Sequence, residues 1–192
     1  MLALYVFTPF SLANALLVAG KPDEAKAYFD AAIDLATDSS FAEHIAVRKA
    51  TETGGYDARA KALLDPGLSI PTELRAALLK GYRAMVLSNA EAKAQAVRSL
   101  LALPEGQQNA MIARLLADLG ASHEAFQVAR RIVTSQRGEP SLFWYPSMRA
   151  TLDDPGFPAV AAQLGLMQYW KATRTKPDVC SEQAPPSFCR MI

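Results

Sequence analysis

The stretch that decides the fold is LANALLVAGKPDEAKAYFDAA, which spans residues 12–32. Apolar residues recur at helical spacing on both sides of Gly20, and a proline two positions later suits the start of a second helix. Two antiparallel helices cross closely only where small side chains meet, and Ala13 and Ala25 stand at the expected crossing. Phe29 is placed to fill the space toward the next element. The stretch therefore predicts a helical hairpin.

The same pattern returns in residues 112–132, where Gly120 separates Ala113 from Ala125. Two weaker copies lie between, and the crossing alanines fall near positions 25, 60, 92 and 125. This spacing resembles that of tetratricopeptide repeats, whose period is about 34 residues. No sustained apolar/polar alternation predicts a strand. We therefore predict an all-α fold, a tetratricopeptide-type helical-hairpin solenoid with about four repeats in residues 1–138.

Composition changes in residues 139–192, where aromatic residues and prolines cluster and both cysteines occur. A solenoid must cover the apolar face of its last repeat. We therefore predict an aromatic and proline-rich C-terminal cap over residues 139–192. Its expected core consists of Trp144, Phe157, Leu164 and Trp170.

The C-terminal segment contains several distinctive short runs: Trp144-Tyr145-Pro146, Asp154-Pro155-Gly156-Phe157, Leu164-Gly165-Leu166, Tyr169-Trp170 and Pro177-Asp178-Val179-Cys180. With these residues it resembles the end of a bacterial family of tetratricopeptide-repeat proteins. In that family an N-terminal winged-helix DNA-binding domain, or sometimes a nucleotide-cyclase domain, precedes the repeats, often with one membrane span between them. Here Val179 replaces the usual Phe, and Gly156 stands where Arg is frequent. The resemblance implies the C-terminal module of a larger transcriptional regulator.

Charge gives no sign of nucleic-acid binding by this segment. Lys and Arg number 20 against 19 for Asp and Glu, whereas phosphate binding favours a basic excess.

The first twenty residues carry no charge, which raises a secretion or membrane interpretation. A secretion signal would begin with basic residues, which are absent here, and Pro9 interrupts the apolar run. These two features favour instead the end of one helix followed by the first helix of a repeat. We expect no membrane span here, although the full-length protein could be anchored, and this apolar start would suit packing against a preceding helix.

Cys180 and Cys189 are the only cysteines, with eight residues between them. A metal site would need further soft ligands, and a redox-catalytic pair would favour tighter spacing. A structural disulfide agrees best with the spacing and would contribute about 2.5–3 kcal/mol in the chain-entropy model. Such a bond persists in an oxidising compartment, which predicts a periplasmic location. Free thiols in a cytoplasmic protein are the alternative.

Motifs for catalysis or cofactor binding are missing from the sequence. It contains no P-loop, GxGxxG, HExxH or GxSxG. His44 and His123 are isolated in expected helices, and the Asp153-Asp154 pair precedes a proline as a turn would. We therefore predict no enzyme activity, no cofactor and no metal.

The first helices of successive hairpins should line a concave groove that holds a protein or peptide partner. The helical register of the two clearest copies predicts Asn14, Leu17, Arg114 and Asp118 as residues of that groove. Two alternatives are open: a self-contained scaffold or assembly protein, and a small-ligand sensor.

Overall fold

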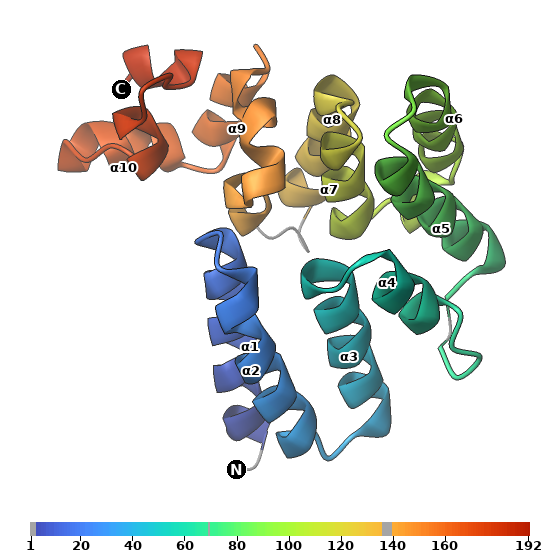
Figure 1. Cartoon of the computed structure of the whole chain (residues 1–192). Coiled ribbons are helices and arrows are strands. Elements are labelled where there is room, and N and C mark those ends of the chain that lie inside the picture. Colours follow the sequence, from blue (N-terminus) through green and yellow to red (C-terminus); the bar gives the residue numbers. More distant parts are fainter. Residues whose placement is uncertain (1–2, 69, 136–139) are drawn as a thin grey trace. The chain divides into compact units, whose positions relative to one another are not determined.

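The computed structural model describes residues 3–68, 70–135 and 140–192 (Figure 1). These residues form α-helices and short 3-10 helices, and no β-strand occurs among them. The prediction of an all-α fold is confirmed. The chain divides into two compact units, Met1–Leu103 and Pro104–Ile192.

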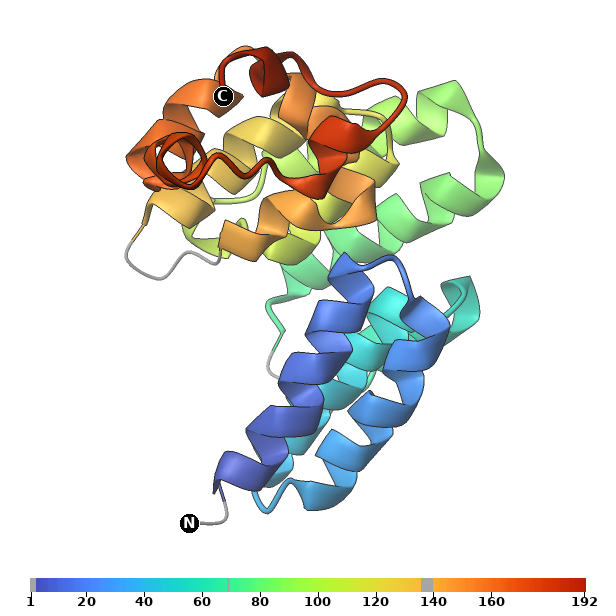
Figure 2. The same ribbon diagram turned by 90° about the vertical axis from the view of Figure 1, so that its left-hand side faces the viewer.

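The first unit contains three successive helix pairs, and each helix packs against the next one in the chain. Figure 2 shows the first two helices (blue) lying side by side. The helices are α1 (Ala3–Val18), α2 (Pro22–Leu35), α3 (Ser39–Thr53), α4 (Tyr56–Leu63), α5 (Thr72–Leu87) and α6 (Ala90–Leu101).

The first hairpin forms as its sequence predicts. Ala13 and Ala25 are fully buried, as is Phe29. The turn uses a glycine with φ of 72° at Gly20, a backbone conformation that costs a residue with a Cβ atom about 1–2 kcal/mol. The amide of Lys21 donates to the carbonyl of Leu16 at 2.8 Å, so the last turn of α1 keeps its hydrogen bonds.

The α1 helix continues through Pro9, where the sequence suggested a helix end. Proline lacks the amide hydrogen, so α1 loses one internal hydrogen bond near its start. On either side of Pro9, the rings of Phe7 and Phe10 pack against aromatic rings of α2 and α3. Among the described residues, no helix combines the length and apolarity that crossing a bilayer requires.

The second unit contains one helix pair followed by shorter helices. Its elements are η1 (Glu105–Gln107), α7 (Ala110–Asp118), α8 (Ser122–Thr134), η2 (Pro140–Trp144), η3 (Pro146–Asp153), α9 (Phe157–Gln163), α10 (Leu166–Thr173), η4 (Asp178–Ser181) and η5 (Ser187–Arg190). The turn of the helix pair repeats that of the first hairpin: Gly120 has φ of 88°, and the amide of Ala121 donates to Leu116 O at 2.9 Å.

The boundary between the two units falls after Leu103, within the segment that the sequence assigns to the repeats (residues 1–138). The physical reason is that η3 packs against both α7 and α8. The ring of Phe126 on α8 also lies 5.9 Å from that of Phe143 in the capping segment. The fourth hairpin and the cap thus share one core.

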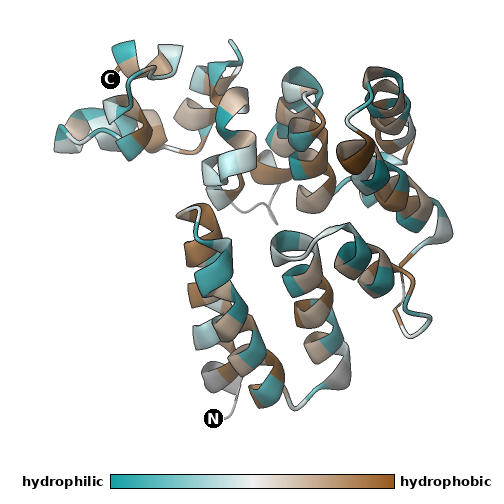
Figure 3. Ribbon diagram, viewed as in Figure 1, coloured by the Kyte–Doolittle hydropathy of each residue, from teal (hydrophilic) through white to brown (hydrophobic). Residues whose placement is uncertain are grey.

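Aromatic rings form the centre of this core. The ring of Phe157 lies 5.3 Å from Phe143 and 4.8 Å from Phe188. Trp170 is 6% exposed, while Trp144 and Leu164 are half-buried. Phe157 and Trp170 are therefore core residues as expected, Trp144 and Leu164 are only partly covered, and the sequence missed the contributions of Phe126, Phe143 and Phe188. Figure 3 shows that α5 to α8 carry both hydrophobic (brown) and hydrophilic (teal) residues, as helices with one buried side do.

Candidate protein-interaction surface

Two of the predicted groove residues lie on α1. Leu17 is 5% exposed, so its side chain belongs to the core. It stands four residues after the buried Ala13 and therefore shares the packed side of the helix. Burial of the Leu17 side chain does not support the prediction that this residue lines a groove. Asn14 is half-buried, and its Nδ2 donates to Phe10 O at 3.0 Å.

The other two predicted residues lie on α7. Arg114 is only 7% exposed, and its guanidinium carbon lies 4.6 Å from the ring centroid of Tyr145. The capping segment therefore covers a position that the repeat pattern left open, and Arg114 contributes to packing. Asp118, at the end of α7, is exposed. A binding role for Asn14 and Asp118 stays a prediction.

Aromatic side chains join the first helices of the first two hairpins. The ring of Phe7 lies 5.5 Å from that of Phe41, and the ring of Phe10 lies 5.8 Å from it. His44 stacks on Phe41 with centroids 6.5 Å apart and planes within 9°. The guanidinium carbon of Arg48 lies 5.9 Å from the Phe10 ring centroid. We call these five residues of α1 and α3 the α1–α3 patch.

The patch combines a fixed base with an open surface. Phe10 rests on the fully buried Phe29, with ring centroids 6.2 Å apart. Phe7, in contrast, leaves 53% of its surface in solvent, and His44 is also exposed. Large exposed aromatic rings on an ordered base are the typical anchors of protein interfaces, because they bury area at little entropic cost.

Electrostatics at the patch favour an uncharged His44. Desolvation of the ring against its neighbours lowers the pKa of His44, and the positive charge of Arg48 lowers this pKa further. The described part of α1 carries no charged side chain. The patch therefore presents π faces, a neutral imidazole and one guanidinium, which suits apolar and aromatic side chains of a partner.

The second unit has a small cavity beside α8. Its volume is about 230 Å³, and its lining consists of Glu105, Gln108, Val128, Arg131, Ile132 and Ser135. Sites for drug-sized ligands usually occupy about 300–1,000 Å³. Arg131 already donates to Gln108 Oε1, and its Nε lies 3.9 Å from Glu105 Oε1. This cavity gives the small-ligand alternative little support.

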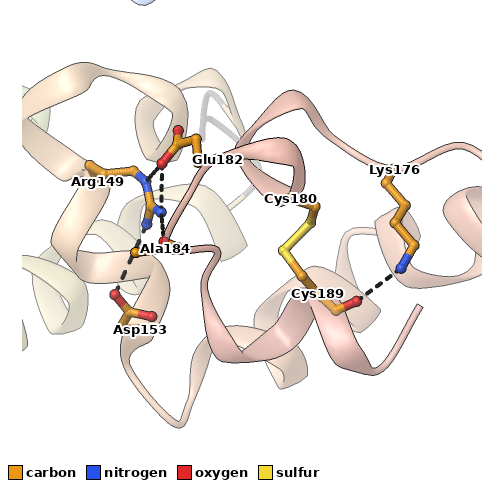
Figure 4. The surroundings of a disulfide bond; sticks show 7 residues. All are labelled: Arg149, Asp153, Lys176, Cys180, Glu182, Ala184 and Cys189. Atoms are coloured by element: carbon orange, nitrogen blue, oxygen red, sulfur yellow. Dashed lines mark hydrogen bonds and ion pairs between the residues drawn. A yellow bond between two sulfur atoms is a disulfide. The ribbon is translucent and has the colours of Figure 1, made fainter.

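The cysteines form the predicted disulfide between Cys180 and Cys189 (Figure 4). Nearby, Arg149 donates from Nε to Glu182 Oε2 at 2.8 Å and from Nη2 to Ala184 O at 2.9 Å. Lys176 Nζ donates to Cys189 O at 3.2 Å. The tail is thus tied to the preceding elements of its unit by side chains.

His123 and Asp154, which the sequence singled out, make contacts within the second unit. In the described ranges, no group of three His, Cys, Asp or Glu side chains could hold a metal ion. Asp154 forms the predicted turn, since its Oδ1 accepts from Gly156 N at 2.9 Å. Its Oδ2 lies 2.8 Å from His123 Nδ1, a contact between α8 and the turn that the sequence did not indicate.

Comparison with known proteins identifies no relative. No protein-family model, curated protein or solved structure matches this chain.

Proposed function

We propose that this chain is a non-enzymatic module of the tetratricopeptide type that binds a protein or peptide through the α1–α3 patch. The observation that carries the proposal is the position of Phe7, Phe10 and Phe41. These rings lie on the first helices of two successive hairpins, where repeat proteins bind their partners, and Phe7 is largely exposed.

The tetratricopeptide assignment is supported by the matching hairpins at the two ends of the array. Ala13, Ala25, Ala113 and Ala125 are each fully buried. The turns at Gly20 and Gly120 share a positive φ. Two segments 100 residues apart therefore use the same residue types for the same packing and turn.

The wider setting that we propose is a larger bacterial transcriptional regulator, of which this chain forms the C-terminal part. DNA binding, and any membrane anchoring, would belong to other parts of that protein. The disulfide supports a periplasmic location for this module, since such bonds persist in oxidising compartments.

The patch is tested by site-specific photo-crosslinking in the source cells. A photoreactive amino acid replaces Phe7 in one variant and Tyr169, which is 58% exposed in the second unit, in a matched control. We expect a discrete cross-linked protein from position 7 that disappears when Arg48→Ala or Phe41→Ala is added. Equal cross-linking from both positions, or none from position 7, would contradict binding at the patch.

The wider setting is tested by the mass of the native protein, detected with an antibody against this module. A band far above 20.7 kDa in the membrane fraction supports the regulator. A band near 20.7 kDa would instead favour the self-contained scaffold.

A further inference from the structure

The C-terminal tail, residues 177–192, has little regular structure of its own. Its helical turns, η4 and η5, contain four residues each. The backbone hydrogen bonds at these turns are local: Cys180 N donates to Pro177 O at 2.8 Å, and Cys189 N donates to Pro186 O at 3.1 Å. Such short turns do not hold a segment in place without tertiary contacts.

The tail is anchored to its unit at two places. At the first, Val179 is 8% exposed and directly precedes Cys180. At the second, Phe188 directly precedes Cys189 and is fully buried, with its ring 4.8 Å from Phe157 and 5.7 Å from Trp170. Residues 181–185, between the anchors, are all exposed.

The disulfide therefore joins the two anchors. Once Val179 is in place, the bond keeps Phe188 within reach of its aromatic site. In the chain-entropy model, closing a ten-residue loop reduces the freedom of the detached segment by roughly a hundredfold. Pro186 of the tail is also buried, and Arg149 and Lys176 add hydrogen bonds close to the surface, where such bonds contribute little (Figure 4).

We propose that the Cys180–Cys189 bond is a redox latch that controls access to the aromatic site of Phe157 and Trp170. In the oxidised protein the site is filled by Phe188. Reduction leaves Phe188 held by a tail that can detach, and detachment opens an apolar surface on α9 and α10. This inference does not depend on the partner of the α1–α3 patch.

The reaction that opens the latch is thiol–disulfide exchange with an external dithiol. One thiolate of the dithiol attacks Sγ of Cys180, which is half-buried, whereas Cys189 is 6% exposed. Cys189 leaves as a thiolate and takes up a proton. The second thiol of the reductant then displaces Cys180, so the dithiol becomes a disulfide and the protein gains two thiols.

The test is amide hydrogen exchange of the full chain, measured by mass spectrometry, before and after treatment with dithiothreitol. After reduction we expect exchange in residues 177–192 to rise at least about tenfold, toward the hundredfold limit of the loop model. Exchange in α7 and α8 should change little. Fluorescence should shift to the red, because both tryptophans lie in this unit and Trp170 contacts Phe188.

Two variants separate the latch from the other ties. Cys180→Ser/Cys189→Ser should show the exchange pattern of the reduced protein without any reductant. Arg149→Ala keeps the disulfide and should retain most of the protection of the tail. Equal protection of the tail from exchange in the oxidised and the reduced protein would overturn the proposal. Phe188 and Arg149 would then be enough to hold the tail without the disulfide. Loss of protection throughout α7 and α8 would also overturn it, since the bond would then stabilise the whole unit.

Discussion

The ring of Phe10 on α1 lies 5.8 Å from the ring of Phe41 on α3, edge toward face at 69°. Through this contact the first helices of two successive hairpins meet directly, in addition to their shared packing on α2. An edge-to-face pair adds about 0.5–1.5 kcal/mol beyond the area that it buries. The patch is therefore an ordered surface, and the partner that we propose for it would not first have to order its side chains.

Among the residues at and beneath this patch, Phe29 should be the one whose replacement lowers stability most. Its side chain is fully buried and contacts Phe10 at 6.2 Å between ring centroids. Phe29→Ala removes the ring and leaves a cavity, so we expect the free energy of unfolding to fall by about 3–5 kcal/mol. Urea denaturation followed by circular dichroism measures the change.

The matched control is Phe7→Ala, on the open side of the same cluster. Because Phe7 is 53% exposed, its removal should lower stability by no more than about 1 kcal/mol. Similar losses for both variants would mean that Phe7 belongs to the core and does not serve as an open anchor.

The hairpins could be predicted from the sequence because their determinants are local. Ala13, Gly20 and Ala25 lie within one short stretch, and the helical period alone places them. The α1–α3 patch was missed, although Phe41, His44 and Arg48 recur at helical spacing. Recognising it required the packing of α1 beside α3, which no local pattern contains.

Arg114 shows the same limit in the second unit. The repeat pattern left this side of α7 open, but Tyr145 covers the guanidinium. Tyr145 directly precedes η3, a 3-10 helix outside the repeat pattern, so no repeat indicates what this residue packs against. Aromatic and proline-rich composition predicted a cap and two of its buried residues, Phe157 and Trp170, but could not specify which surface the cap covers.

Acidification should destabilise the first unit through His44. Desolvation and Arg48 hold the pKa of His44 below its ordinary value near 6.5. The folded state therefore binds fewer protons than the unfolded state as the pH falls through 6.5. The contribution of this residue is fully present above pH 6.5 and is lost progressively at lower pH.

The pKa of His44 can be measured from its imidazole proton shifts by nuclear magnetic resonance. We expect a value below 6.5, and we expect His44→Gln to flatten the pH dependence of stability between about pH 5 and 7. A His44 pKa above 6.5 would contradict the environment described for the patch.

Gly120 should not tolerate a side chain, although space is available around it. A Cβ atom there would meet nothing within 4 Å, so any cost of Gly120→Ala comes from φ of 88°. We expect a loss of about 1–2 kcal/mol. Gly106→Ala is the matched control: its added Cβ also meets nothing within 4 Å, and its φ is not positive. Thermal unfolding of both variants measures the difference, and equal behaviour would show that the turn does not require glycine.

A side chain at Gly156 should also lower stability, but here the cause is lack of space and not the backbone conformation. Its backbone is ordinary, but a Cβ atom would lie 2.9 Å from Cε1 of Phe126, which is fully buried and cannot easily move. We expect Gly156→Ala to lower the free energy of unfolding by about 1–3 kcal/mol. Phe126→Leu, although destabilising by itself, removes the ring edge that causes the clash. In a double-mutant cycle the alanine should therefore cost less in the Phe126→Leu background, and strictly additive losses would show that the two residues do not limit each other.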